Sequence, residues 1–396
     1  MGPTDNRTGA NNSAQTTTTD QSRAVATTTS RAAATGTTPA TGTTPATGTT
    51  QPTGTTTNTT PTTGTVAPTT QGTMQAFVQD SYGTTDVLRP ARIDRPEIAD
   101  NEVLLRVHAA GLDRGTWHVM AGRPYLMRVL GFGFRRPKNR VPGIDVAGTV
   151  VAVGSAVTRF AVGDEVFGMS RGSFAEYAAA REDKLAHKPS NCTFEQAAVT
   201  GISGGTALQA LVAGGLQAGQ RVLIIGASGG VGSFAVQLAA ALGADVTGVC
   251  STEKLELVRS LGANHVIDYT KSDFADGARQ YDLIIDIAGN SPLSRLRRAL
   301  TATGTAVIVG GESKGNLTGG IDRQLRAMIL TPFVGQRLTG LASKERASDL
   351  EVLANHIAAG TVTPSIDRSY PLDQVPDAMR NLEAGRVKGK TAIIII

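Results

Sequence analysis

The chain of 396 residues has few cysteines and few aromatic side chains. Its two cysteines, Cys192 and Cys250, lie far apart in the sequence, which excludes a disulfide framework and a zinc site built from four cysteines. Aromatic residues make up only 4% of the chain. Since a nucleic-acid site usually needs a clustered basic face with aromatic platforms, the composition predicts no nucleic-acid partner.

Long apolar runs and a strong charge bias are also missing. No apolar stretch reaches the ~18 residues of a membrane span, and the N-terminus lacks the apolar core of a secretory signal. These absences predict no membrane partner and a cytoplasmic location. The net charge of +5 is interpreted as thinly spread. The densest basic run, residues 135–140, is interpreted as a solvated loop, with attraction of phosphate or carboxylate groups as the alternative.

Residues 1–73 are rich in threonine, glycine and proline. The unit Thr-Gly-Thr-Thr-Pro-Ala begins at Thr35 and repeats at Thr41. Because this segment has almost no large apolar side chains, it cannot bury enough surface to offset the loss of chain entropy on folding. We therefore expect a disordered tail.

From residue 74 onward, short apolar runs alternate with turn residues. The first runs predict strands of a mostly antiparallel, partly barrel-like module, at residues 74–79, 102–109, 141–153, 165–169 and 173–180. After residue 221 strands alternate with helices, the strands being at 221–225, 245–250, 265–268, 281–287 and 304–310. Such alternation predicts a doubly wound parallel sheet, so the fold class is α/β with a second, mostly β module.

Helical patterns and a strongly β-forming end complete the predicted elements. The helices are expected at residues 193–201, 205–211, 233–242, 253–261, 294–300, 343–360 and 373–384. The last residues, 390–396, are expected to return to the first module rather than to extend the parallel sheet.

A glycine cluster lies between the strand predicted at 221–225 and an alanine-rich helical segment. Glycines let the backbone approach a pyrophosphate, and the helix N-terminus offers unpaired N–H groups to it. The pattern predicts a dinucleotide-binding turn, with an ordinary strand-end turn as the alternative. Its residues are Gly226, Ala227, Ser228, Gly229, Gly230, Val231 and Gly232.

Five motifs in order resemble the medium-chain dehydrogenase/reductase superfamily. They are residues 111–113, 141–148, 162–166, 206–208 and 226–232. The resemblance implies a GroES-like catalytic domain over residues 74–195, a Rossmann cofactor domain over 196–335, and a return to the catalytic domain over 336–396. It also implies an active site between the two domains and a homodimer.

Within that family the chain is similar to the zinc-free quinone oxidoreductases, including their reticulon-interacting relatives. Catalytic zinc needs three protein ligands and an open fourth position. Here Asp113 stands where the zinc enzymes have a ligand cysteine, Ile144 and Asp145 stand where they have histidine and glutamate, and the third cysteine is missing. The resemblance therefore implies no metal. A site assembled from His108, His118 and Asp113 is the alternative.

The end of the strand at 245–250 bears on the choice of nicotinamide cofactor. An acidic side chain there suits the ribose of NADH, whereas hydroxyls and a cation suit a 2′-phosphate. Ser251, Thr252 and Lys254 can donate hydrogen bonds to phosphate oxygens. Tyr269 matches a tyrosine that the family places beside this phosphate. We therefore predict NADPH, with NADH as the alternative because Glu253 lies close by.

The resemblance implies further cofactor contacts. Thr206 would lie near the nicotinamide, and Lys390 would reach a cofactor phosphate, with a solvated lysine as the alternative. It also implies cofactor contacts from residues at the ends of two strands and from a segment near the nicotinamide carboxamide. These residues are Ala288, Gly289, Val309, Gly310, Phe333 and Val334. A strand-end turn or a core position is the alternative role for each.

Together these features predict a zinc-independent, NADPH-dependent reductase. Without a Lewis acid to polarise a carbonyl, acceptors that already delocalise negative charge are favoured, which means a quinone or an activated enone. The candidate catalytic residues come from the segment that the family uses to line its substrate cleft, and they are Asp113, Thr116 and Tyr125. An NADPH-binding sensor or scaffold and an alcohol dehydrogenase are the alternatives.

Overall fold

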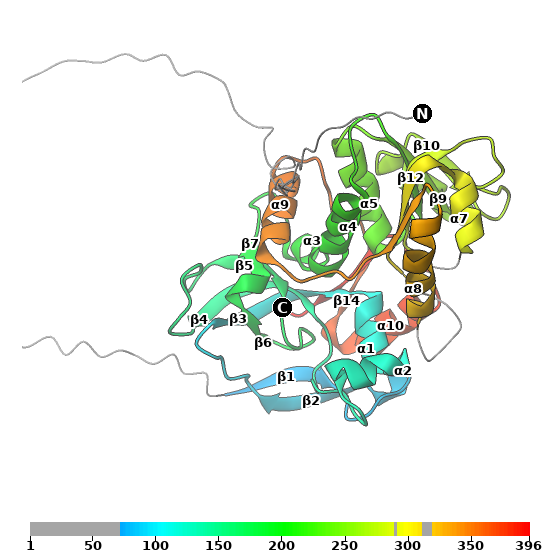
Figure 1. Ribbon diagram of the computed structural model, residues 1–396. Helices are drawn as coiled ribbons and strands as arrows, with labels where there is room; N and C mark the ends of the chain where they lie inside the picture. The colour runs from blue at the N-terminus through cyan, green and yellow to red at the C-terminus, as the bar shows by residue number, and fades with distance from the viewer. Residues whose placement is uncertain (1–71, 289–290, 311–318) are drawn as a thin grey trace, which may run out of the picture. The chain divides into compact units, whose positions relative to one another are not determined.

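The computed structural model describes residues 72–288, 291–310 and 319–396 (Figure 1). These residues belong to one compact unit, Ala67–Ile396. The expected tail lies outside the described residues, apart from its last two positions. Within the described residues, no helix is long and apolar enough to cross a membrane.

Two sheets organise the first part of the chain and its C-terminal end. A small antiparallel sheet pairs β1 (Thr73–Val78) with β2 (Arg89–Asp94). The larger sheet has the order β14-β15-β3-β4-β5-β7, and β6 (Tyr177–Arg181) pairs with β3. Its other strands are β3 (Glu102–Leu112), β4 (Asp145–Val153), β5 (Glu165–Met169), β7 (Leu185–His187), β14 (Ile366–Pro371) and β15 (Lys390–Ile394). Only β14 and β15 are parallel, so the predicted antiparallel module is confirmed.

Strand β3 lies at the centre of the larger sheet because it is apolar on both faces. Val103, Leu105 and Val107 enter one buried cluster, whereas Ala110 and Leu112 enter another. The register with β4 shifts between Val107 and Ala109, where one extra residue of β3 forms a bulge. The C-terminal strand β15 pairs antiparallel with β3, as its expected return to this module requires.

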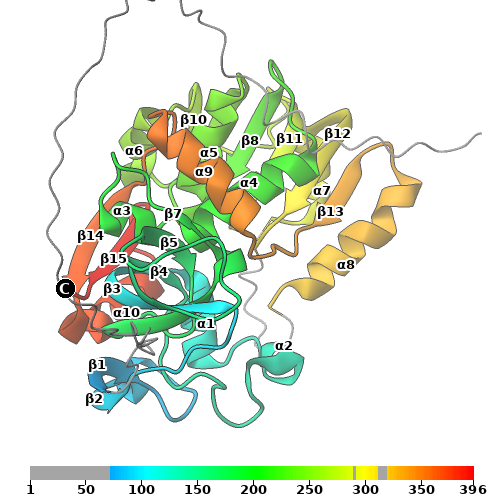
Figure 2. The same cartoon turned by 90° about the vertical axis from the view of Figure 1, so that its left-hand side faces the viewer.

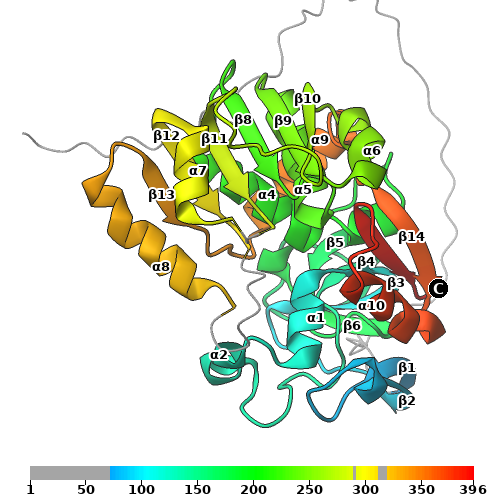
Figure 3. The same cartoon turned by 90° about the vertical axis from the view of Figure 1, so that its right-hand side faces the viewer.

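The second sheet is parallel throughout, with the order β10-β9-β8-β11-β12-β13 (Figures 2 and 3). Its strands are β8 (Arg221–Ile225), β9 (Asp245–Cys250), β10 (His265–Asp268), β11 (Tyr281–Asp286), β12 (Leu300–Ile308) and β13 (Arg337–Gly340). In β8, Val222 and Ile224 face one core while Leu223 and Ile225 face another. Burial on both faces explains the unbroken apolar run, and the predicted doubly wound sheet is confirmed.

Helices cover both faces of the parallel sheet (Figures 2 and 3). One core includes α4 (Gly201–Gly214), α5 (Gly230–Ala241) and α6 (Leu255–Ser260), and the other includes α7 (Leu293–Ala299) and α8 (Ile321–Leu330). The remaining helices are α1 (Arg114–Ala121), α2 (Tyr125–Met127), α3 (Phe194–Ala198), α9 (Ala347–Ala358) and α10 (Val375–Glu383). Short single turns precede or follow some of them, including η3 (Arg128–Phe132), η5 (Thr252–Lys254) and η6 (Thr331–Phe333).

Several elements differ from their sequence-based bounds. The parallel sheet extends to Gly340, beyond residue 335, because β13 is a short edge strand with little apolar signal. The strand expected from residue 141 begins only at Asp145, since Pro142 and Gly143, with φ +92°, form a turn. The sequence pattern also missed β2, β14, α1 and α8. Of these, β2 and β14 alternate weakly and lie at sheet edges.

Candidate functional site

The glycine turn joins β8 to α5, and its backbone atoms are closely packed. The N–H groups of Gly226 and Ala227 both donate to the Val249 carbonyl oxygen, each at 3.1 Å. A Cβ atom at Gly232 would lie 2.2 Å from the Gly226 carbonyl oxygen, so only glycine fits there. Because the first N–H groups of a helix have no acceptor within it, the start of α5 presents free donors at Gly230 and the residues after it. This is a cradle for an anionic group.

Predicted residues from three strands meet at this turn. The Ala288 N–H donates to the Ile225 carbonyl oxygen at 3.2 Å, after β11 ends. The N–H groups of Val309 and Gly310 donate to the Asp286 carbonyl oxygen at 3.0 and 3.3 Å, after β12 ends. The strand order reverses between β8 and β11, which is where ligands bind in open parallel sheets. Gly289 lies outside the described residues.

Two predicted contacts lie away from this edge. Phe333 and Val334 precede β13, whose first residue pairs with Thr305 of β12, so they lie at the amino end of the parallel strands. Phe333 is 80% exposed. The residue that leaves β13 at the carboxyl edge of the sheet is Leu341, whose N–H donates to the Ile308 carbonyl oxygen at 2.9 Å. Phe333 and Val334 thus lie at the opposite end of β13 from Leu341, and their cofactor contact stays a prediction.

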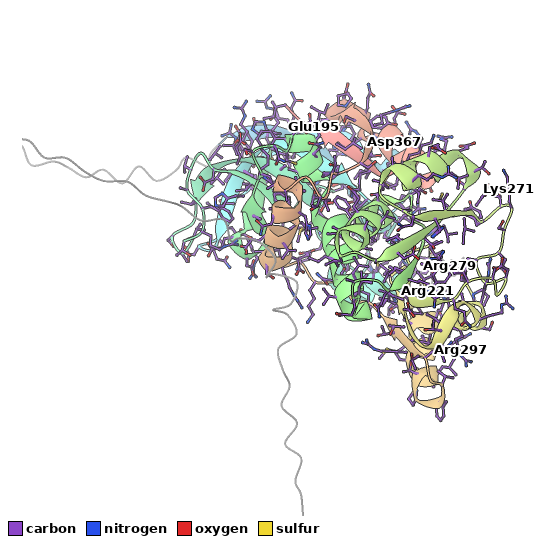
Figure 4. The ribbon with its side chains drawn as sticks, turned by 90° about the horizontal axis from the view of Figure 1, so that it is seen from above. Glu195, Arg221, Lys271, Arg279, Arg297 and Asp367 are labelled. Carbon is purple, nitrogen blue, oxygen red and sulfur yellow. The ribbon has the colours of Figure 1, made fainter. Side chains whose placement is uncertain are left out.

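Thr252, one of the residues expected to choose between cofactors, contacts a carboxylate that the sequence reasoning missed. Asp268, at the end of β10, accepts hydrogen bonds from the hydroxyls of Thr252 and Thr270. These bonds, led by that from Thr252, lower the pKa of Asp268. Lys271 Nζ lies 3.7 Å from Asp268 Oδ2 on a largely exposed side chain (Figure 4). Asp268 directly precedes Tyr269, the residue predicted to lie beside the 2′-phosphate. The Tyr269 side chain is 60% exposed.

The Lys254 side chain is hydrogen-bonded to a neighbouring segment of the chain and does not point into solvent. Its Nζ donates to the carbonyl oxygens of Gly385 and Val387 at 3.1 and 2.7 Å. Burial lowers the pKa of Lys254. A few residues later, the Gly389 N–H donates to the Ser228 carbonyl oxygen at 2.8 Å. The segment before β15 therefore contacts both the η5 turn and the glycine turn.

Lys390 follows that segment and enters a buried polar cluster. Its Nζ lies 3.0 Å from Ser203 Oγ and 3.5 Å from Asp145 Oδ2. Asp145 Oδ1 accepts a hydrogen bond from the Ile202 N–H at 2.7 Å. Burial is the main cause that raises the pKa of Asp145 to about 7. The positive charge of Lys390 lowers this pKa, and the negative charge of Asp113 raises it. A Cβ at Gly230 would lie 2.9 Å from Lys390 Cδ, so the lysine stem packs on the glycine turn.

Asp113 and Thr116 lie together at the start of α1. Asp113 Oδ1 accepts a hydrogen bond from the Thr116 N–H at 2.7 Å and so caps the helix. Both side chains are buried, and Asp113 Oδ2 and Thr116 Oγ1 have no hydrogen-bond partner among the described residues. Tyr125 is 41% exposed at the start of α2, where the Arg128 guanidinium lies over its ring. The structure thus brings two of the three predicted catalytic residues together.

Thr206, on α4, lines a cavity of about 20 Å³ with Met169, Gly205 and residues 343–346. A cavity of this size holds about one water molecule. Thr206 is half-buried and lies one helical turn beyond Ser203, so α4 carries side chains to both the cavity and the polar cluster.

The possible metal ligands are engaged in other contacts. His108 stacks on Phe194, and its Nε2 lies 3.1 Å from Thr149 Oγ1. His118 Nδ1 lies 2.8 Å from the Arg123 carbonyl oxygen. In the part of the chain that the structure describes, no group of three or more His, Cys, Asp or Glu side chains could hold a metal ion.

Comparisons with known proteins agree with this fold. Residues 99–190 match the alcohol dehydrogenase GroES-like domain, 197–290 the alanine dehydrogenase/PNT C-terminal domain, and 261–393 the zinc-binding dehydrogenase family. The chain is 34% identical to a 2-methylene-furan-3-one reductase of Solanum lycopersicum, over 81% of this chain and 79% of the relative. It is 32% identical to the mitochondrial NAD(P)H oxidoreductase RTN4IP1 of Mus musculus, over 82% and 89%. The quinone oxidoreductase structure from Coxiella burnetii is 28% identical, covers 82% of this chain and all of that one, and has a TM-score of 0.71.

The GroES-like module, the parallel sheet and the glycine turn therefore define the class, and the chain belongs to the medium-chain dehydrogenase/reductase superfamily. Within that superfamily it is an oxidoreductase of the quinone or enone reductase type.

Proposed function

We propose that this protein catalyses the zinc-independent, NADPH-dependent reduction of a quinone or an activated enone. The observation that carries the proposal is the meeting of the glycine turn with a buried polar cluster that has no metal-ligand set among the described residues. Lys390 contacts Gly230 of the turn through its stem and Asp145 through its ammonium group. The relatives named above act on an enone or are named for quinone or NAD(P)H oxidoreduction, which supports the same substrate classes.

The residues at the carboxyl edge of the parallel sheet fit a nicotinamide dinucleotide. The residues of the glycine turn, 226–232, would hold the pyrophosphate, because Gly232 permits the close approach and α5 supplies free N–H groups. Thr206, Ala288, Val309 and Gly310 would lie toward the nicotinamide. The 2′-phosphate would be recognised at Ser251, Thr252, Lys254 and Tyr269, and this assignment favours NADPH over NADH. When bound, the cofactor supplies a hydride.

The chain's own groups would orient the acceptor and manage its proton. Asp113 Oδ2 and Thr116 Oγ1 are buried polar atoms without a described partner. Such atoms are costly unless a ligand or water satisfies them, so Thr116 Oγ1 would bind the substrate oxygen and Asp113 Oδ2, an acceptor, would bind a donor group of the substrate or a water molecule. The Thr116 hydroxyl would donate a hydrogen bond to the oxygen on which negative charge develops. Tyr125 would lie at the rim of the same site.

A turnover assay tests this proposal. Oxidation of NADPH and NADH is followed with a quinone, an enone and an alcohol–aldehyde pair, before and after dialysis against a chelator. We expect turnover of a quinone or an enone, a lower KM for NADPH than for NADH, and no loss on chelation. Thr116→Val is expected to lower kcat about tenfold or more while NADPH affinity stays unchanged.

The alternatives give different results in the same assay. NADPH binding without turnover of any acceptor would indicate a sensor or scaffold. Chelator-sensitive oxidation of an alcohol, with metal detected by elemental analysis, would indicate an alcohol dehydrogenase. Either result would overturn the proposal.

A further inference from the structure

The positive charge of this chain is concentrated in one segment. Residues 114–144 contain seven Lys or Arg and no Asp or Glu, whereas the whole chain has a net charge of +5. All remaining residues together are therefore slightly acidic, since 5 − 7 = −2. The positive charge is therefore not thinly spread over the chain, as its composition had suggested, but lies mostly in this segment.

The same segment exposes large apolar side chains at a fixed turn. Val129 is 69% exposed, Phe132 42% and Phe134 71%. The turn is held by hydrogen bonds to its backbone carbonyl oxygens, because Tyr82 Oη donates to that of Gly133 at 2.6 Å and the Lys138 N–H donates to that of Phe132 at 2.8 Å. The exposure is therefore a property of an anchored structure. Figure 3 shows α2, which leads into this turn, at the periphery of the molecule.

Three basic side chains follow the exposed apolar residues directly. Arg135, Arg136 and Lys138 are exposed and form no ion pair with any described residue. Arg140, in contrast, is paired with Asp80, with Nε and Oδ1 2.6 Å apart. Three cations thus remain available beside an apolar turn, without an acidic residue of the same segment to neutralise them.

We propose that residues 129–138, here named the basic apolar turn, dock this protein onto the surface of an anionic lipid membrane. Val129, Phe132 and Phe134 would enter the boundary between headgroups and acyl chains, and Arg135, Arg136 and Lys138 would contact the lipid phosphates. This is peripheral binding, and it replaces the sequence-based expectation of no membrane partner.

The arrangement of side chains favours a membrane over a nucleic acid. Single-stranded nucleic acids are bound where aromatic platforms lie along a basic groove. Here the apolar residues are grouped at the turn, Val129 offers no stacking face, and the cations follow as a separate group. An apolar tip with adjacent cations has the polarity of a lipid surface, which is apolar inside and negatively charged outside.

Vesicle sedimentation of the full chain tests the proposal. The probes are vesicles of phosphatidylcholine alone and of phosphatidylcholine mixed with phosphatidylglycerol. We expect binding to the anionic vesicles only, weakened by salt. The variant R135Q/R136Q/K138Q is expected to bind about 100-fold more weakly, since each cation near an anionic surface contributes about fivefold. The variant F132S/F134S is expected to bind about tenfold or more weakly.

Matched variants remove the same charge and apolar area elsewhere. R92Q/R346Q/R368Q takes away three exposed arginines, and V162S/V212S takes away two exposed apolar side chains. Both are expected to bind as the unchanged chain does. Circular dichroism and thermal unfolding check that all variants fold.

Three results would overturn the proposal. They are no binding of the unchanged chain to anionic vesicles at low salt, equal binding to both kinds of vesicle, and losses in the matched variants as large as in the turn variants. Tighter binding of the unchanged chain to single-stranded RNA than to anionic vesicles, lost in R135Q/R136Q/K138Q, would assign the turn to a nucleic acid instead. These measurements need no substrate, so their failure is separate from failure of the proposed reductase activity.

Discussion

Asp145 is fully buried, and its carboxyl group is held between the Ile202 N–H and Lys390. Burial is the main cause that raises its pKa from 3.8 to about 7, so the group binds a proton more tightly in the folded than in the unfolded chain. The pKa of Asp268 is shifted the other way, because hydrogen bonds from the hydroxyl groups of Thr252 and Thr270 lower it. The surroundings of these two carboxyl groups thus shift their pKa values in opposite directions.

The raised pKa of Asp145 predicts a specific dependence of stability on pH. Between about pH 4 and pH 7 the folded chain holds a proton that the unfolded chain has lost, so this group's contribution to stability falls as pH rises through that window. We expect the unfolding free energy of the unchanged chain, minus that of Asp145→Asn, to decrease across the window and to level off above it. Urea unfolding over this pH range measures the difference. A difference that stays constant would contradict the raised pKa.

Asp268 is predicted to limit the preference for NADPH, provided that a 2′-phosphate binds beside Thr252 and Tyr269 as proposed. Its negative charge would lie near that phosphate, and Asp268→Asn removes the charge while keeping a side chain that can accept from Thr252. We expect the KM ratio of NADH to NADPH to rise about two- to fivefold. Asp377→Asn, at an exposed acid on α10, serves as the control. An unchanged ratio would place the phosphate elsewhere.

At the scale of elements, the glycine turn between β8 and α5 depends on close backbone packing. Gly232 meets the Gly226 carbonyl oxygen, whereas the Cβ of an alanine at Gly229 would lie 3.5 Å from the same oxygen, at ordinary contact distance. The two glycines therefore differ in what they permit, although both belong to one motif. Gly232 brings the helix close to the strand, and Gly229 begins the helix as its N-cap.

This difference predicts unequal effects of two neighbouring substitutions. Gly232→Ala forces the backbone apart and is expected to lower the unfolding free energy by about 1–3 kcal/mol and to weaken dinucleotide binding. Gly229→Ala is expected to change the unfolding free energy by about 0.5 kcal/mol or less. Denaturant unfolding and calorimetric titration with NADPH measure both quantities. Equal losses of stability in the two variants would show that close packing at Gly232 is not the cause.

At the scale of the whole molecule, the C-terminal segment joins the two sheets. Lys254 and Ser228 of the parallel module bind the segment before β15, and β15 itself pairs with β3 of the antiparallel module. Lys390 lies at the junction, where its ammonium group reaches Ser203 on α4 and Asp145 on β4. The glycine turn and the buried polar cluster therefore share one lysine.

Removal of that lysine is predicted to destabilise the fold in a pH-dependent way. Lys390→Met leaves Asp145 buried without its cation, and we expect a loss of about 3–5 kcal/mol of unfolding free energy above pH 7, where the carboxyl group ionises. A smaller loss is expected near pH 5, where Asp145 is protonated. The double variant Lys390→Met/Asp145→Asn is expected to be more stable than the sum of the single losses predicts. Purely additive losses in chemical denaturation would refute the coupling.

The sequence by itself determined the two modules, most strand positions and the glycine turn. These features depend on apolar periodicity and turn chemistry, which act between residues that are close in the chain. Only the tertiary structure decided that Lys390 meets Asp145, 245 positions earlier in the sequence, and that Asp268 meets Thr252. It also decided that Phe333 and Val334 lie at the amino end of β13, because strand order and register fix which residues share an edge. Such long-range pairings follow from how the sheets pack, and no local pattern records them.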